Sequence, residues 1–160
     1  MANYQLKRVQ TLPLSIEKLW DFFSHPNNLQ VITHPDVKFI QLTKLQDDEA
    51  MYPGMIIRYK FAPFLGIFFK WETEITEVKE RDYFIDSQKS GPFAMWQHRH
   101  SFKSVAEGTE MTDFLEYRPP YGFLGTMAHG MFLRKQLETV FDFRFKKLEE
   151  LFGKVQPKNN

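Results

Sequence analysis

The stretch GPFAMWQHRHSF, residues Gly91–Phe102, alternates between two kinds of side chain from Trp96 onward. Successive residues of a β-strand point to opposite faces, so Trp96, His98, His100 and Phe102 share one face, and the residues between them are polar or charged. The aromatic rings indicate that the shared face is the buried one. Two histidines therefore point to where a core would hold aliphatic side chains.

The segment Thr109–Arg118 continues the alternation, and a turn at Gly108 joins it to the first segment as a hairpin. Its inward side chains are apolar with one exception, and they are Met111, Asp113, Leu115 and Tyr117. Asp113 lies opposite Phe102 or opposite His100, depending on the register of the hairpin. A register that places it beside His100 predicts a buried pair in which the carboxylate orients the imidazole and raises its pKa.

Three interpretations of His98, His100 and Asp113 stay open. Two histidines and one carboxylate are the minimum for a metal site, with no cysteine to support it. A His–Asp pair in an aromatic pocket suits general acid–base catalysis, such as proton transfer or water addition to a carbonyl compound. In the third interpretation the side chains satisfy one another, as structural pairs or as polar anchors for a molecule bound in an apolar cavity. We favour the third, and expect no metal and no cofactor.

The period of two extends over most of the chain between residues 55 and 118. Charged side chains alternate with apolar ones around Tyr59 and again around Trp71, so each segment has one apolar face. Such strands belong to an antiparallel sheet with one face in water. The other predicted strands are Tyr4–Leu12, Val37–Leu42, Tyr83–Ser87, Met95–Ser104 and Thr109–Arg118.

Helical patterns flank the strands. Ser15 is a suitable N-cap for a helix of about nine residues that is closed by the His25-Pro26 pair, and Asn27–Ile32 fits a second short turn. After residue 122 the apolar period becomes 3.6, which predicts one helix of about 25 residues ending near Gly153. Its basic residues alternate with acidic ones and indicate a solvated face: Arg134, Lys135, Arg144, Lys146 and Lys147.

This order of elements predicts an α+β domain in which a sheet wraps its apolar face around the long helix, leaving room for a cavity. The length of 160 residues corresponds to one domain, which we place at residues 1–153, followed by a flexible tail at 154–160. With no cysteine, a thiol nucleophile, an iron–sulfur cluster and a disulfide framework are excluded. The 16% of aromatic residues fits either a core of rings or a wall around an apolar ligand.

The charge pattern argues against nucleic acid as a partner, because 21 basic residues are balanced by 20 acidic ones and no basic stripe is present. The longest apolar run, Phe61–Phe69, is far too short to span a bilayer and contains a proline. No secretory signal opens the chain. We therefore expect a cytoplasmic protein without membrane insertion, as a monomer or a weak homodimer.

Several of these motifs together resemble the START-like superfamily, also called SRPBCC or Bet v 1-like, in a bacterial branch of uncharacterised proteins. The resemblance spans about residues 4–152, and its most specific element is Trp96-x-His98-x-His100-x-Phe102. It is supported by these further segments: Ser15-x4-Trp20-x-Phe22-Phe23, His25-Pro26, Pro53-Gly54-Met55, Trp71-x-Thr73-x-Ile75-Thr76, Gly91-Pro92-Phe93 and Thr109-x-Met111-x-Asp113-x3-Tyr117.

The resemblance implies a helix-grip fold, in which a seven-stranded antiparallel sheet curls around a C-terminal helix, with two short helices after the first strand. Members bind lipids, polyketides, sterols or plant hormones, and some are cyclases or aromatase-like enzymes. The ligand-binding positions implied in this chain are Tyr59, Trp71, Trp96, His98, His100, Phe102, Asp113, Tyr117 and Met131.

These observations lead to a functional prediction with alternatives. We expect the chain to bind a hydrophobic or aromatic small molecule in an internal cavity. The first alternative is a small cofactor-free cyclase, hydratase or isomerase that uses His98 or His100 with Asp113. The second is an interaction module whose long helix or Pro119–Gly125 loop contacts a partner protein or a second copy.

Overall fold

The computed structural model describes residues 3–64, 66–120 and 132–156. In chain order, the elements are β1 (Tyr4–Leu12), α1 (Ile16–Ser24), the 3-10 helices η1 (Pro26–Ile32) and η2 (Pro35–Val37), β2 (Ile40–Gln41), β3 (Ile56–Phe64), β4 (Ile67–Lys79), β5 (Tyr83–Ser90), β6 (Met95–Val105), β7 (Gly108–Arg118) and α3 (Arg134–Phe152). Two short helices after β1 and a C-terminal helix were all predicted, and all are present.

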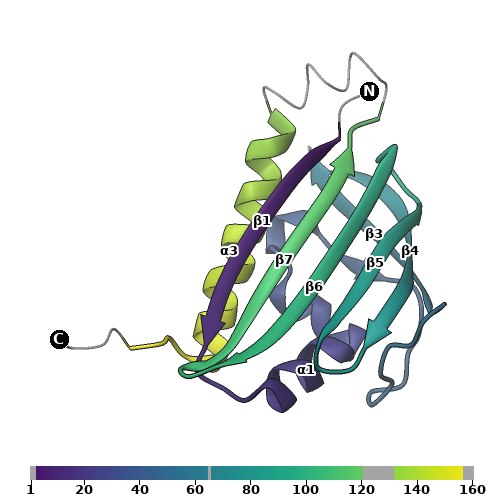
Figure 1. Cartoon of the computed structure of the whole chain (residues 1–160). Helices are drawn as coiled ribbons and strands as arrows, with labels where there is room; N and C mark the ends of the chain where they lie inside the picture. The colour runs from purple at the N-terminus through teal and green to yellow at the C-terminus, as the bar shows by residue number, and fades with distance from the viewer. Residues whose placement is uncertain (1–2, 65, 121–131, 157–160) are drawn as a thin grey trace.

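The seven strands form one antiparallel sheet in the order β1-β7-β6-β5-β4-β3-β2. β1 pairs with β7, so the first and last strands of the chain are neighbours, and α3 runs alongside them (Figure 1). The register shifts between Phe61 and Phe64 in β3, and again between Ile75 and Glu77 in β4. Bulges of this kind bend strands and increase their twist, which lets the sheet curl around the helix. The predicted helix-grip fold is confirmed.

Local sequence signals set the ends of the helices. The Ser15 side chain accepts a hydrogen bond from the Lys18 N–H at 3.5 Å and caps α1, as predicted. His25 is the C-cap of α1, and Pro26 follows it and prevents continuation of the helix, because proline lacks the N–H that helical hydrogen bonding needs. At the other end of the chain, the N–H of Gly153 donates to the carbonyl of Glu149 at 2.8 Å and closes α3.

The strand predicted at Val37–Leu42 is mostly wrong. Only Ile40–Gln41 pairs with β3, while Pro35–Val37 forms η2. The proline fixes a helical φ, and the side chain of His34 accepts a hydrogen bond from the Asp36 N–H at 3.1 Å, which stabilises a tight turn instead of a strand.

The long helix begins at Arg134 within the described residues and has 19 residues. The preceding part of the predicted helix, together with Met131 and residues 121–125 of the predicted loop, lies outside the part of the chain that the structure describes. The same is true of residues 157–160 of the predicted tail.

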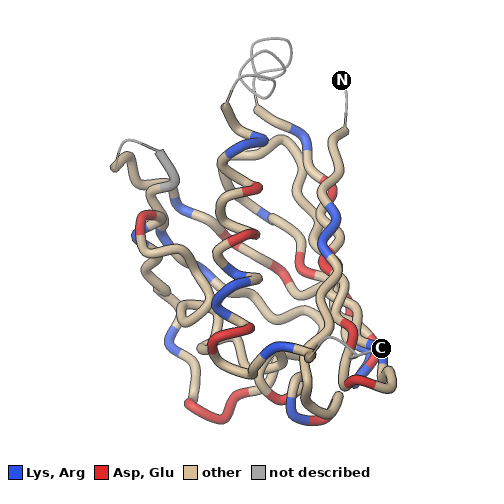
Figure 2. The backbone as a smooth tube through the Cα atoms, turned by 90° about the vertical axis from the view of Figure 1, so that its left-hand side faces the viewer, with Lys and Arg blue, Asp and Glu red and all other residues tan. Residues whose placement is uncertain are grey.

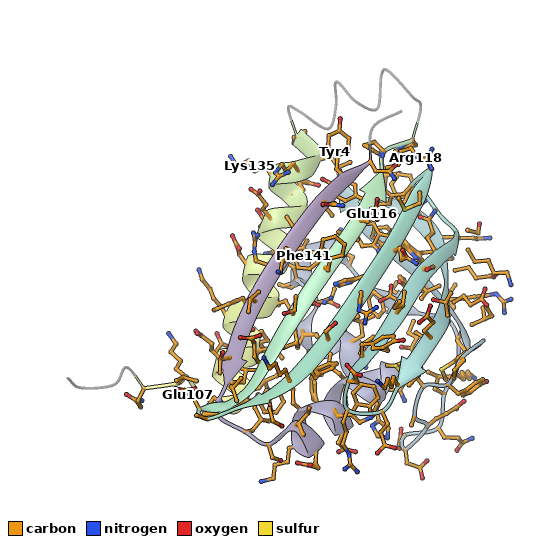
Figure 3. All side chains as sticks on the ribbon, in the orientation of Figure 1. Tyr4, Glu107, Glu116, Arg118, Lys135 and Phe141 are labelled. Carbon is orange, nitrogen blue, oxygen red and sulfur yellow. The ribbon has the colours of Figure 1, made fainter. Side chains whose placement is uncertain are left out.

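Two groups of buried apolar side chains lie under the helices. One joins α1 to the sheet through Leu19, Trp20 and Phe102. The other lies under α3, where Leu137 and Phe141 pack on residues of β1 and β7, and Figure 3 shows Phe141 between the helix and these strands. A cluster of buried polar side chains lies where these two apolar groups approach each other.

Acidic and basic residues are interspersed along α3, as Figure 2 shows, and no basic stripe follows its exposed face. Among the described residues, no helix is long and apolar enough to cross a membrane.

The hairpin turn before β7 provides a test of the fold. Gly108 has φ +139°, and a Cβ atom there would lie 2.1 Å from the carbonyl oxygen of Leu12. We expect Gly108→Ala to lower the free energy of unfolding by about 3 kcal/mol, because backbone strain and a clash with main chain add. Gly54→Ala is the matched control, since Gly54 has φ +90° but no atom within 4 Å of the added Cβ. Urea denaturation of both variants should give a loss of only about 1 kcal/mol for Gly54→Ala, and equal losses would contradict the account.

Candidate functional site

The register of the β6–β7 hairpin, left open by the sequence, places His100 directly opposite Asp113. His98 pairs with Leu115, and Phe102 with Met111. The predicted inward face of β6 is confirmed, since His98 and His100 are 4% and 5% exposed, and Asp113 on the neighbouring strand is equally buried. The side chains therefore meet inside the sheet's concave face.

A second carboxylate completes the cluster. Asp86 of β5 pairs across the strands with His98, and its side chain reaches His100. A hydrogen bond of 2.9 Å joins its Oδ2 atom to Nε2 of His100, and Nδ1 of His98 lies 3.9 Å from the same oxygen. Sequence reasoning did not single out Asp86. The signal was available, because Asp86 follows the inward Phe84 by two residues on a strand that was itself predicted.

Asp113 lies behind the two imidazoles and holds both. Its Oδ1 atom is hydrogen-bonded to Nε2 of His98 at 3.0 Å. The same oxygen is 2.8 Å from Nδ1 of His100, in an ionic contact that is out of line for a hydrogen bond. The rings of His98 and His100 are 3.8 Å apart. Each histidine thus has one nitrogen directed at Asp113 and the other directed toward Asp86.

The two histidines differ in the direction of their pKa shifts. Burial disfavours the charged form of both, but the hydrogen bond between His100 and Asp86 and the charges of Asp113 and Asp86 outweigh it at His100 and raise the pKa of that imidazole. Burial and the neighbouring charge of His100 lower the pKa of His98. Burial also opposes ionisation of the carboxylates, yet the histidines hold the pKa of Asp86 below its usual value and that of Asp113 well below it. These shifts favour ionised carboxylates, and they favour the charged imidazole more at His100 than at His98.

Arg144 of α3 approaches this cluster from the helix side. Its Nη1 atom lies 3.7 Å from Oδ1 of Asp113, and its side chain is 12% exposed. The charge pattern of the helix predicted a solvated position for Arg144, and this prediction is wrong because its side chain is largely buried. The signal missed was helical spacing, since Arg144 follows the buried Phe141 by three residues and precedes the buried Leu148 by four.

A cavity of about 1330 Å³ lies between the sheet, α3 and the short helices. Five of the predicted ligand-binding residues line it: Tyr59, Trp71, Trp96, His98 and His100. Asp86 and Arg144 line it as well. Rings form much of one wall, where Tyr59 stacks on Trp71 at 6.1 Å between centroids and Trp96 meets Trp71 edge-on at 5.0 Å.

Three predicted ligand-binding residues are buried behind the wall. Phe102 packs against the rings of Trp20 and Phe23, each at 5.5 Å, and Tyr117 is fully buried with Leu137 and Phe141. Asp113 is covered by the two histidines. Strand alternation identifies the inward face of a strand but not which inward side chains are covered by other parts of the protein. Phe102, Asp113 and Tyr117 were therefore assigned to the cavity along with the other inward residues.

Asp86, His98 and His100 also have the composition of a metal site, with one ligand atom from each within 4.8 Å of the others. An ion there would have to replace the hydrogen bond between His100 and Asp86. As arranged, each imidazole has one hydrogen bond to a carboxylate, His98 to Asp113 and His100 to Asp86, which supports mutual pairing of these side chains.

Comparison with known proteins connects this geometry to a family. The family described as "Polyketide cyclase / dehydrase and lipid transport" matches residues 12–144 of the chain. No functionally curated protein matches the sequence.

Solved structures share the fold at low sequence identity. A protein of Chromobacterium violaceum superposes with a TM-score of 0.68 and 14% identity over 93% of this chain and 97% of that one. The ginseng major latex-like protein 151 of Panax ginseng gives a TM-score of 0.66 and 11% identity over 94% and 97% of the two chains. A protein of Thermus thermophilus gives a TM-score of 0.62 and 17% identity over 93% of this chain and 95% of that one.

Asp113 should control both the stability of the domain and the charge of His100. We expect Asp113→Asn to destabilise the protein by about 3 kcal/mol, because it leaves His100 and Arg144 without their shared anion. The pKa of His100 should fall, and NMR titration of the imidazole resonances measures it. Asp142→Asn is the control, because Asp142 pairs with Arg8 at the surface at 3.2 Å and should cost less than about 0.5 kcal/mol.

The sign of the pH dependence follows from the directions of these shifts. The stabilisation from His100, whose pKa is raised in the fold, is fully present below its unfolded value of about 6.5 and is lost as pH rises through the folded pKa. The stabilisation from Asp113, whose pKa is lowered in the fold, is present above its unfolded pKa of about 3.9 and is lost as pH falls through its folded pKa. The free energy of unfolding, measured by denaturation, should therefore differ most between the native protein and Asp113→Asn between about pH 4 and pH 6.5. A difference in free energy that is constant from acid to alkaline pH would refute the coupling between Asp113 and His100.

Proposed function

Because this chain belongs to the polyketide cyclase/dehydrase and lipid transport family, we propose that it binds a hydrophobic or aromatic small molecule in the cavity beneath α3. The observation that carries the proposal is the cavity itself, with its volume of about 1330 Å³ and its wall of stacked rings. Ligand pockets for drug-sized molecules span roughly 300–1,000 Å³, so this one has room for a lipid chain or several fused rings.

The arrangement of polar groups supports orientation of the ligand as well as burial. His98, His100 and Asp86 line one part of an otherwise mostly apolar cavity. Asp113 acts as a positioning residue, since it fixes both imidazoles from behind. An apolar body gains about 2.5 kcal/mol for each 100 Å² removed from water, and a few fixed polar groups then determine which way round it lies.

The binding proposal is tested by filling the cavity. Val140 of α3 lines the cavity and is half-buried, so Val140→Trp should place a large ring in the space a ligand would use. We expect binding of the neutral fluorescent probe N-phenyl-naphthylamine to weaken about ten-fold or more, as expected when an apolar ligand loses a large part of its buried area. The control is Lys146→Trp, at an exposed position of the same helix. Native mass spectrometry of the freshly purified protein should show a bound small molecule that Val140→Trp lacks, and equal probe affinity in the two variants would refute the site.

A second candidate function is a cofactor-free cyclase, hydratase or isomerase. One observation favours it. The imidazoles of His98 and His100 both line the cavity, are held by Asp113 and Asp86, and have pKa values that are shifted in opposite directions. His98, whose pKa is lowered, is suited to accept a proton, and His100, whose pKa is raised, is suited to donate one.

Catalysis and simple binding are separated by replacing each histidine with glutamine. In a turnover screen on aromatic and polyketide-like carbonyl compounds, His98→Gln and His100→Gln should each lower the rate at least about 100-fold, the usual contribution of a general acid or base. Both should retain affinity for N-phenyl-naphthylamine, which shows that the cavity is intact. Unchanged turnover in both variants would leave binding as the function.

A further inference from the structure

Several side chains of the cavity wall carry buried nitrogen atoms that have no hydrogen-bond partner in the part of the chain that the structure describes. Among the described residues, the buried side-chain atoms that line the cavity and lack a hydrogen-bond partner include Nε and Nη1 of Arg144 and Nε1 of Trp71. Nδ1 of His100 also belongs to this set, but it is in contact with Asp113. Arginine and indole nitrogens are donors and never acceptors. A ligand that complements this wall must therefore bring acceptor atoms.

Arg144 is the strongest of these donors, because its guanidinium is charged at every accessible pH. Asp113 is its nearest carboxylate, but the 3.7 Å between Nη1 and Oδ1 is too long for a hydrogen bond. That same oxygen already carries the hydrogen bond from His98 and the contact with His100. The guanidinium otherwise faces the ring of Phe141 at 5.4 Å. A buried charged donor without an acceptor is costly, and a ligand oxygen removes that cost.

The other charge on the cavity wall near this cluster is already compensated. Asp86 lines the same cavity, but its Oδ2 atom is hydrogen-bonded to His100 at 2.9 Å and lies 3.9 Å from His98. The negative charge of Asp86 is therefore partly offset by His98 and His100. The guanidinium of Arg144, in contrast, has no hydrogen-bonded anion in the described chain and can attract a negative group on a ligand. Near this cluster, Arg144 is the charged group that can attract an anion.

Trp71 adds a donor on a different element. It lies on β4, is 6% exposed, and its ring is held between Tyr59 and Trp96. The indole N–H has no acceptor within the described part of the chain. Trp71 thus contributes a flat apolar surface to the cavity wall and carries one buried N–H group that lacks an acceptor among the described residues.

We infer that the ligand of this cavity carries an acceptor-only oxygen group, a carboxylate above all, which Arg144 binds while Trp71 donates to a further acceptor oxygen. This inference rests on the proposed binding function and specifies its ligand class. The apolar body of the ligand lies along the rings of Tyr59, Trp71 and Trp96. Molecules that bring a donor or a positive charge to Arg144 are rejected, because they leave the guanidinium without an acceptor and add repulsion.

The test compares ligands that share a skeleton and differ in one polar group. Dodecanoate, dodecanol and dodecylamine form an aliphatic series, and naphthoate and naphthyl methanol form an aromatic pair. Each competes with N-phenyl-naphthylamine, which is bound to the full chain. Hydrogen bonds to charged groups contribute about 1.5–3 kcal/mol, so the carboxylate should bind at least about ten-fold more tightly than the alcohol of the same skeleton in at least one series, and dodecylamine should be the weakest aliphatic ligand.

Variants test the role of Arg144. Arg144→Met should abolish the advantage of the carboxylate, while Arg134→Met, the control at an exposed position of the same helix, should retain it. Trp71→Phe keeps a flat ring without the N–H and should also retain the advantage, because dodecanoate and naphthoate have no acceptor oxygen beyond the carboxylate that Arg144 binds.

Two failures are distinguishable. If the probe binds but the carboxylates have no advantage over alcohols, or Arg144→Met preserves that advantage, the inference is overturned while the binding proposal stands. If neither the probe nor any member of the two series binds, the proposed function itself is overturned. Loss of the preference in Trp71→Phe alone, with Arg144→Met unaffected, would also overturn the assignment to Arg144.

Discussion

The carboxylate of Asp113 is the point at which the sheet, the polar cluster and the long helix meet. One of its oxygens contacts His98, His100 and the guanidinium of Arg144, which come from β6 and α3. His100 extends the contact to Asp86 on β5. A single buried anion thus connects three adjacent strands to the helix that crosses them. Removing it would leave Arg144 without its ion pair and would remove one of the two carboxylate contacts of His100.

Stability alone does not account for such a cluster. Replacing a buried ionic network with apolar side chains of similar volume is often neutral or stabilising, because desolvation offsets most of the Coulomb attraction. The domain also has apolar side chains on either side of the cluster, since Phe23 and Phe84 contact His100 and Phe141 contacts His98. A continuous apolar core was therefore accessible to this fold. The polar cluster instead gives the cavity wall fixed donors, acceptors and charges, which is what orientation of a ligand requires.

Much of this arrangement can be read from the sequence, and the parts that cannot have physical causes. The period of two alone identified the inward face of β6 and placed His98 and His100 in the interior. It could not fix the register opposite Asp113, which depends on the turn at Gly108. The same period places Asp86 on the inward face of β5, but its pairing with the histidines was missed because they lie more than ten residues away in the chain. Phe102 and Tyr117 were assigned to the cavity because alternation gives the direction of a side chain but not the helix that covers it. Arg144 was missed because a long charged side chain in a charge-rich helix resembles a solvated one.

The cavity differs from the apolar core in how its polar groups are satisfied. Near the cluster, the Oδ2 atom of Asp86 is hydrogen-bonded to a histidine within the protein, whereas Nε of Arg144 and Nε1 of Trp71 have no acceptor in the described chain. The carboxylate on this part of the wall is thus paired internally, and the guanidinium is not hydrogen-bonded to a described residue. Because a missing hydrogen bond to a buried charged donor costs more than a missing apolar contact of similar size, this asymmetry discriminates among ligands more sharply than the shape of the ring-lined wall. The aromatic wall provides affinity for many apolar bodies, and the two donors determine which of them are retained.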